Sequence, residues 1–396
     1  MTAKLVNAPE YPRMLEYESN IFFARFEYPA ETTRHIATIL GFPSKCSLPP
    51  VHYRNACEEI SQLAKLVSEF EPVRLYTKPE DVKLAQSMIS NKDCGSFGVD
   101  IIPFDTNHLW VRDTAPVYVI GGDSNPEDRD RRLAINFRFH EWGNKISLQN
   151  GLEIDYEWPD LGEDEIRKNS TFAKRVIEND FHPSPVTCIE SKVCLEGGAI
   201  VCDGDGTLIA SESSIIDNER NPGLSKQTIE EELSRLLGVK KFIWFPGFKD
   251  LDVTDVHADA EVQFVRPGVV VLSRPHQSAP KDWWKVYEQV KRALTLEKDA
   301  IGRQIQIHTI DEPDPKFTKS SKHEDPATNY VNFYFVNGGL IIPGFGDPQK
   351  DIQALETMKA LCPDRIVKQI HVNALPLNGG VIHCSTQPVI DISGGF

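Results

Sequence analysis

The chain has 396 residues, a hydrophobic fraction of 40% and a formal net charge of −15. Such an acidic balance argues against a nucleic-acid partner, because lysine and arginine must neutralise the phosphates. No stretch approaches the ~18 consecutive apolar residues of a membrane span, and residues 1–13 lack the basic and apolar regions of a secretory signal. We therefore expect a cytoplasmic protein without nucleic-acid or membrane partners.

The 8 cysteines and 11 histidines are scattered along the chain. No cysteines are spaced as CxxC and no histidines as HExxH. Neither a disulfide framework nor a zinc site is expected from such spacing. The sequence predicts reduced thiols, no metal and no cofactor.

Residues 1–28 are expected to form an irregular N-terminal arm before a single domain, 29–396. Five times in this domain a helical pattern leads to a short β-rich run. The expected pairs are 54–70 with 73–76, 171–179 with 186–189, 228–237 with 242–245, 282–294 with 305–307, and 348–361 with 366–370. In the third pair, Thr228 and Glu231 predict a capping box and Gly238 predicts the helix end.

Three segments repeat a polar residue, two glycines and two apolar residues, at 196–201, 337–342 and 378–383. Self-similarity of this kind predicts repeated modules around a shared centre. One doubly wound α/β sheet is the alternative, because it also alternates helix and strand. A dinucleotide site is not expected, since no GxGxxG follows a strand.

Three polar segments are predicted to be connections between these elements. We expect a hairpin tip at 121–131 and a mobile rim or lid at 311–328. Asp203–Gly206 is predicted to be a β-turn, because the glutamate required at the twelfth position of a calcium loop is replaced by Ser214.

Four further segments carry polar residues that a packed core does not need, at 110–116, 196–198, 254–259 and 378–385. Each alone has a structural explanation. His257 and Asp259 fit a polar pair on one face of a strand. Cys384 fits a buried thiol after a strand that starts at Val381 and Ile382.

Together these segments suit nucleophilic attack on a cationic carbon. A guanidinium group is planar and charged, and carboxylates bind it through paired hydrogen bonds. Asp113 and Asp259 are the candidates to bind it, and Cys384 is the candidate nucleophile, activated by the bound cation. His257 can protonate departing ammonia and then activate water, while Glu196 can orient His257.

The four segments resemble the agmatine deiminase family, grouped with the Porphyromonas-type peptidylarginine deiminases in the guanidino-group-modifying superfamily. The family motifs WxRDxGP, EGG, TDGHxD and GGGxIHCxTQ stand here as WVRDTAP (110–116), EGG (196–198), TDVHAD (254–259) and NGGVIHCSTQ (378–387). Further matches lie at 218–222, 332–334, 343–346 and 363–365. The likeness runs from about His35 to Pro388.

This resemblance implies an α/β fold, a five-bladed pseudo-symmetric β/α propeller with a central active-site channel. It implies hydrolytic deimination through a covalent thiouronium on Cys384, with no metal or cofactor. The expected substrate is a small cationic guanidino compound, first of all agmatine, which would give N-carbamoylputrescine. Trp110 and Asp255 lie in the matched motifs and join Asp113 and Asp259 as expected substrate contacts. The sequence leaves the oligomeric state open, with a homodimer as one alternative.

Several positions depart from the family pattern. Ala115, Val256 and Asn378 replace glycines, and Ile39 replaces a tryptophan that could stack on a cation. Arginine or peptidylarginine deimination and amidino transfer therefore remain open alternatives. An inactive guanidine-binding homologue is the last alternative, and the complete set of five catalytic residue types argues against it.

Overall fold

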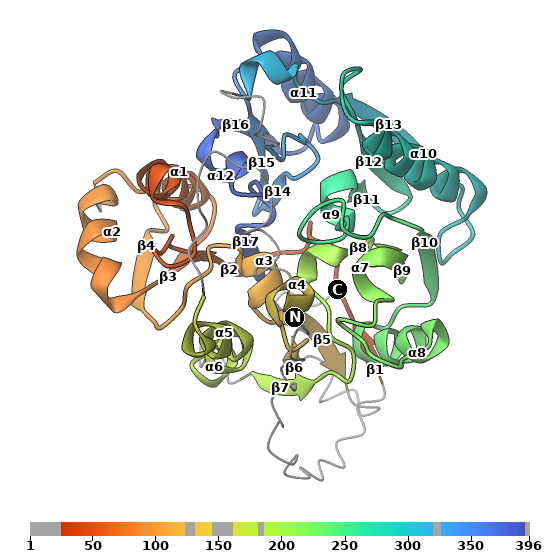
Figure 1. Ribbon diagram of the computed structural model, residues 1–396, viewed down its shortest axis with the longest axis horizontal. Coiled ribbons are helices and arrows are strands. Elements are labelled where there is room, and N and C mark those ends of the chain that lie inside the picture. Colours follow the sequence, from red (N-terminus) through yellow and green to blue (C-terminus); the bar gives the residue numbers. More distant parts are fainter. Residues whose placement is uncertain are drawn as a thin grey trace, which may run out of the picture.

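The computed structural model describes residues 25–90, 92–122, 131–144, 161–180, 186–319 and 326–392. The strands in these ranges form five separate sheets, with helices packed against them (Figure 1). The predicted alternation of helix and strand is confirmed. The alternative of one doubly wound sheet is wrong for the described residues, because no strand joins two of the five sheets.

All five sheets share one arrangement. A first strand pairs antiparallel with a second, the chain crosses over through a helix, and a third strand runs parallel to the second. Figure 1 shows the crossover helices around the outside of the molecule and the short helices α3 and α9 near its middle. The crossover helices are α1 (Pro50–Val67), α6 (Phe172–Glu178), α8 (Lys226–Leu237), α10 (Lys281–Leu296) and α11 (Pro348–Leu361).

The sheets follow one another along the chain. In spatial order their strands are β17 (Thr386–Ile390), β2 (His35–Gly41), β3 (Val73–Thr77) and β4 (Val99–Pro103); β1 (Arg25–Glu27), β5 (Val117–Gly122), β6 (Arg131–Asn136) and β7 (Thr187–Glu190); β8 (Ile200–Cys202), β9 (Thr207–Ser211) and β10 (Lys241–Phe245); β11 (Val262–Arg266), β12 (Val269–Arg274) and β13 (Gln306–Asp311); and β14 (Tyr334–Val336), β15 (Gly339–Gly344) and β16 (Ile366–His371).

Short helices connect these elements. They are α2 (Val82–Met88), α3 (Val111–Thr114), α4 (Glu141–Asn144), α5 (Glu163–Ser170), α7 (Glu212–Ile215), α9 (Ala258–Glu261), α12 (Ala374–Leu377) and the 3₁₀ turns η1 (Pro79–Asp81), η4 (Gly197–Ala199) and η5 (Pro315–Phe317). None of the helices in the described ranges has the length and apolar character needed to cross a bilayer.

The first and the last described strands are both paired within sheets. The C-terminal strand β17 pairs with β2, so that Thr386 lies opposite Leu40. Strand β1 pairs with β5, so Arg25–Glu27, which fall within the predicted arm, are part of a sheet. Residues 1–24 of the predicted arm lie outside the described residues.

Apolar spacing explains the outer helices, of which α10 is an example. Val286, Val290 and Leu294 recur every four residues and are fully buried against strands β10 and β12. Burial of such a side chain contributes about 1.5–3 kcal/mol. The predicted end of α8 is confirmed, since Gly238 adopts the left-handed conformation with φ 67°. The predicted capping box is wrong: the cap is Ser225, whose hydroxyl accepts a hydrogen bond from the Thr228 amide, at the true start of the helix.

The first predicted helix begins at Pro50 rather than Arg54 and ends at Val67. Proline fits the first turn of a helix, because the missing N–H has no partner there anyway. The predicted turn at Asp203–Gly206 is confirmed, as it joins the antiparallel strands β8 and β9 and its Asp203 side chain accepts from the amides of Asp205 and Thr207. Strands β5 and β6 form the predicted hairpin up to Gly121 and Arg131, and residues 123–130 at its tip lie outside the described residues. In the other predicted connection, 311–328, residues 320–325 lie outside the described residues.

The three double-glycine segments do not form one repeated turn, so this part of the repeat argument is wrong. Gly197 and Gly198 lie in the 3₁₀ turn η4, Gly338 lies in the hairpin between β14 and β15, and Gly379 follows helix α12. The repeated unit is the strand–strand–helix–strand arrangement, which tolerates different sequences because burial, not residue identity, defines it.

Val256 is held in an unfavourable backbone conformation. Its φ is 70°, next to Asp255 at φ 62°. A β-branched side chain in the left-handed region costs about 1–3 kcal/mol. By contrast, Ala115 has φ −83° and Asn378 has φ −105°, conformations that are open to any residue. Of the three replaced glycines, only Val256 therefore carries backbone strain.

We predict that Val256→Gly leaves stability within about 1 kcal/mol of wild type, because relief of backbone strain offsets the lost burial of the side chain. Val262→Gly is the matched control, since Val262 is equally buried in the same cluster and extended, with φ −151°. It should cost about 3 kcal/mol or more. Chemical denaturation of both variants measures the difference, and equal losses would contradict the assignment of strain.

Candidate active site

Five short turns bring the candidate residues together. Each turn immediately precedes the first strand of one sheet: α3 before β5, η4 before β8, α9 before β11, a turn before β14 and the turn 382–385 before β17. In this order the turns carry Asp113, Glu196, His257 with Asp259, Asn332, and Cys384. Residues far apart in sequence meet at these turns, and Figure 1 shows two of them, α3 and α9, near the middle of the molecule.

Two local predictions for this site are wrong, although the residues converge. Val381 and Ile382 do not start a strand; β17 begins at Thr386, and Cys384 lies in the turn before it. His257 and Asp259 do not lie on a strand, because His257 caps the short helix α9 that contains Asp259. Apolar runs this short do not distinguish a strand from a buried turn.

Cys384 is the nucleophile candidate, and it is partly exposed. Its Sγ lies 3.7 Å from Asp259 Oδ2 and 3.3 Å from the side-chain amide nitrogen of Asn332. The Cys384 amide donates to Asn332 Oδ1 at 3.3 Å, while its carbonyl accepts from the Arg112 amide at 3.1 Å. The turn that carries the thiol is therefore fixed from two neighbouring sheets.

Asp259 is fully buried and only half satisfied. Its Oδ2 is 2.6 Å from His383 Nδ1. Its Oδ1 has no hydrogen-bond donor among the described residues. A buried carboxylate oxygen without a donor costs about 1–3 kcal/mol or more, so this oxygen is suited to receive an N–H from a bound cation.

Asp113 is the second buried carboxylate. Trp142 Nε1 donates to its Oδ2 at 2.9 Å, and the Gly198 amide donates to its Oδ1 at 3.1 Å. Trp142 lies in a left-handed stretch, with φ 55° at Glu141 and 51° at Trp142. Burial raises the pKa of Asp113, an effect that the neighbouring His257 opposes.

His257 lies among carboxylates. Its Nε2 is 3.3 Å from Glu196 Oε2, and its Nδ1 is 3.8 Å from Asp113 Oδ1. Burial alone would lower the pKa of His257, but Asp113, Glu196 and Asp259 together raise it to about 9. The ring is therefore charged near neutral pH and can donate a proton to a departing amine.

Glu196 is kept ionised by Arg220. The Nε of Arg220 lies 3.1 and 3.0 Å from the two carboxylate oxygens of Glu196. Burial acts to raise the pKa of Glu196, but Arg220 and His257 hold it at about 2. Asp255, expected to contact substrate, instead accepts from Arg220 Nη1 at 2.7 Å and from the Asp250 amide. Asp255 therefore holds Arg220 in the position in which it pairs with Glu196.

Gly198 occupies the point where three of these residues meet. A Cβ built on it would lie 2.7 Å from His257 Nδ1 and 2.9 Å from Asp113 Oδ1. It would also lie 3.1 Å from Asp259 Oδ2. The absence of a side chain at this glycine therefore leaves open the space between the histidine and the two aspartates.

Trp110 and Ile39 have packing roles. Trp110 is 7% exposed, and a Cβ on Gly380 would come within 2.6 Å of its ring, so the glycine of the cysteine motif makes room for it. Ile39 is fully buried in a cluster with Val111 and Ala115. The aromatic contact that the resemblance implies near the substrate has no counterpart at Ile39.

Sequence reasoning missed four supporting residues: Asn332, Arg220, Trp142 and His383. Asn332 and Arg220 stand in segments that match the family, so a signal existed but no role could be assigned. His383 also stands in a matched motif, but its role depends on a contact with Asp259 on another sheet. Trp142 gave no signal, because its function depends on a contact with Asp113. In the described parts of the chain, no three histidine, cysteine or acidic side chains are grouped so as to hold a metal ion.

The thiol of Cys384 is protonated in the empty site. Burial, together with Asp259 and Asp113, raises its pKa well above the usual range of cysteine. A cation bound between the aspartates would oppose these charges and favour the thiolate. Substrate binding and activation of the nucleophile are thereby coupled.

We predict that alkylation of Cys384 by iodoacetamide in the free protein still accelerates above about pH 9, beyond the range of an ordinary thiol. Asp259→Asn should shift the alkylation profile to lower pH, because it removes a negative charge next to the sulfur. Mass spectrometry of the peptide that contains Cys384 gives the rate at each pH. A wild-type midpoint near that of free cysteine would contradict the buried, anionic environment.

Known proteins resemble this chain over nearly its whole length. The chain is 30% identical to an agmatine deiminase of Medicago truncatula, covering 94% of this chain and 99% of the relative. It is 29% identical to an agmatine deiminase of Pseudomonas aeruginosa, covering 91% and 95%. The structure of the agmatine deiminase of Enterococcus faecalis superposes with a TM-score of 0.76 at 24% identity, over 92% of this chain and 95% of that chain. The Porphyromonas-type peptidyl-arginine deiminase profile matches residues 27–389, and the chain belongs to this family.

Proposed function

We propose that the protein hydrolyses the guanidinium group of agmatine to give N-carbamoylputrescine and ammonia. The observation that carries this proposal is the thiol of Cys384 beside Asp259, a buried aspartate that keeps one oxygen without a donor among the described residues. Asp113 supplies a second buried carboxylate near the same point. Two carboxylates and one thiol fit a planar cation with an electrophilic carbon. The agmatine deiminases among the relatives support the choice of substrate.

In the first step, the Cys384 sulfur forms a bond to the guanidinium carbon. Asp113 and Asp259 bind the substrate N–H groups, and the proton of the thiol is released as the cation binds. His257 then donates its proton to a terminal nitrogen, the C–N bond breaks, and ammonia leaves a thiouronium bound to the sulfur.

In the second step, a water replaces the ammonia. His257, now neutral, accepts a proton from the water as its oxygen bonds to the carbon. The C–S bond breaks as the remaining hydroxyl proton passes to the sulfur, the ureido product leaves, and the thiol of Cys384 is restored. Glu196 lies 3.3 Å from His257. It is positioned to stabilise the imidazolium of His257 in both steps.

The same proposal extends to the architecture. We infer that the five sheets are the blades of one β/α propeller domain and that the five turns line its central channel. The common strand order of the sheets and the pairing of β17, the last described strand, with β2 from the early part of the chain support this inference. The cytoplasmic location and the homodimer stay predictions.

We predict that the protein converts agmatine to a ureido product and ammonia faster than it converts free arginine or a blocked arginyl peptide. Colorimetric ureido assay and ammonia release measure all three reactions in parallel. Cys384→Ala should lower the rate by at least about 10⁴-fold, because it removes the nucleophile. Cys94→Ala is the matched control, since Cys94 is also partly exposed and lies in a different part of the structure.

A preference for arginine or the peptide would replace agmatine by one of the alternative substrates. Absence of ureido product from all three, with guanidinium compounds still bound, would contradict an enzymatic role. Retained turnover in Cys384→Ala would contradict covalent catalysis.

We predict that Gly198→Ala lowers kcat/KM by about 100-fold or more, because the new methyl group displaces His257 or the aspartates by a fraction of an ångström. Gly162→Ala serves as a control, because Gly162 has φ −72° and its nearest neighbour is the flexible end of Glu165. Steady-state kinetics and thermal melting are measured for both. A fully active Gly198→Ala protein would show that this point of the site is not confined.

A further inference from the structure

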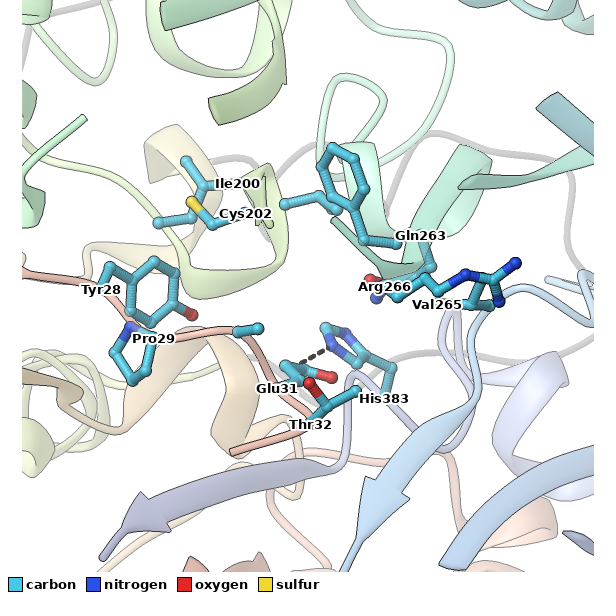
Figure 2. A pocket seen from close by; sticks show the side chains of 13 residues that line it. Tyr28, Pro29, Glu31, Thr32, Ile200, Cys202, Gln263, Val265, Arg266 and His383 are labelled. Atoms are coloured by element: carbon cyan, nitrogen blue, oxygen red, sulfur yellow. Dashed lines mark hydrogen bonds and ion pairs between the residues drawn. The ribbon is translucent and has the colours of Figure 1, made fainter. Parts of the chain in front are cut away.

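His383 lies between two carboxylates. Its Nδ1 is 2.6 Å from Asp259 Oδ2, and its Nε2 is 2.7 Å from Glu31 Oε1. Figure 2 shows the contact between Glu31 and His383, with the ring reaching up from the turn before β17. A neutral imidazole has a single N–H, whereas an ionised carboxylate only accepts hydrogen bonds. Both short contacts are satisfied at once only when both ring nitrogens carry a proton.

Glu31 is fixed as the outer acceptor by Arg112. Arg112 Nη1 lies 2.7 Å from Glu31 Oε1, and the Arg112 side chain is 1% exposed. Although burial acts to raise the pKa of Glu31, Arg112 and His383 hold it at about 2. Arg112 Nε also donates to the His383 carbonyl at 3.3 Å, so one arginine holds both partners.

We propose that His383 and Glu31 are positioning residues: His383 is a cationic ring, held by Glu31, that occupies one oxygen of Asp259, so that the other oxygen is left to bind the substrate. This inference rests on the proposed function, because Asp259 is the substrate-binding carboxylate there. The geometry assigns Glu31, from the segment that follows β1, a part in the reaction even though it does not touch the reacting atoms.

A small cavity borders this pair. Its volume is about 20 Å³, enough for one water molecule. Figure 2 shows it between Tyr28, the β8 residues Ile200 and Cys202, and the ring of His383. Side-chain exposure is 17% for Glu31, 2% for His383 and 0% for Asp259. Protons can therefore exchange with His383 on the Glu31 side, away from the substrate.

The charge on the ring follows from its surroundings. Burial and Arg112 lower the pKa of His383, whereas Glu31 and Asp259 raise it, and the net direction is upward. The imidazolium is therefore favoured relative to a free ring, is present at low pH and is lost as the pH rises through the raised pKa. The titratable groups around the ring and its cavity are Tyr28, Glu31, Arg112, Cys202, Asp259, Arg266 and Cys384.

The test compares Glu31→Gln with wild type. Glutamine keeps the shape and one acceptor oxygen but removes the charge that favours the imidazolium. Glu232→Gln is the control, because Glu232 is a buried glutamate on α8 that accepts hydrogen bonds from Arg235 and from the Lys192 amide, outside the site. The readouts are the ¹⁵N shifts of the histidine rings and the pH profile of kcat/KM for agmatine.

In wild type, both ring nitrogens of His383 are expected to carry protons at about pH 7.5. In Glu31→Gln the ring should lose a proton at lower pH than in wild type. The loss of kcat/KM relative to wild type should therefore be about tenfold larger at about pH 9 than at about pH 7. Glu232→Gln should melt earlier yet keep the wild-type pH profile.

A singly protonated His383 in wild type near neutral pH would overturn the proposal, and this result needs no variant that folds. A Glu31→Gln profile that superposes on wild type after scaling would also overturn it. The ring shifts are read without turnover. If the protein converted none of the three substrates, the proposed function would fail while the charge of His383 would still be decided.

Discussion

The balance of buried charge is the constraint on which the site depends. Asp113, Glu196 and Asp259 lie within one small volume that is almost closed to water. Buried carboxylates at this spacing are tolerated only when cations or hydrogen-bond donors compensate for them. Arg220 and His257 compensate Glu196, and His383 compensates one oxygen of Asp259. The other oxygen of Asp259, Oδ1, has no donor among the described residues.

This incomplete compensation gives the site its selectivity for a cation. Bringing a guanidinium between Asp113 and Asp259 completes the charge balance and favours ionisation of the Cys384 thiol. An uncharged analogue would do neither. The raised pKa of Cys384 in the empty site is therefore compatible with catalysis, since the nucleophile is formed when its target is present. It also keeps the thiol less reactive towards other electrophiles.

The five helix–strand units could be predicted because their apolar periodicity is a local signal, as α1 and α10 illustrate. The five residues of the site could be predicted because each stands in a distinctive motif whose chemistry complements the others. Local shape could not: the short runs before Cys384 and around His257 form turns rather than strands, and Asp255 faces Arg220 rather than the site. Trp142, His383 and Glu31 act across sheets, and no sequence pattern reveals such contacts. The valine that replaces a glycine at position 256 indicated reduced backbone freedom, but only the φ of 70° establishes the strain.

The central claim is that Cys384 forms a covalent bond to the guanidinium carbon. The most direct measurement is rapid acid quenching of the protein during turnover of agmatine, followed by mass spectrometry of the intact chain and of the peptide that contains Cys384. The account predicts a transient mass increase equal to agmatine minus ammonia, located on Cys384 and absent from Cys384→Ala. Ureido product formed at the wild-type rate without any adduct at this residue, within a time course that resolves single turnovers, would contradict it.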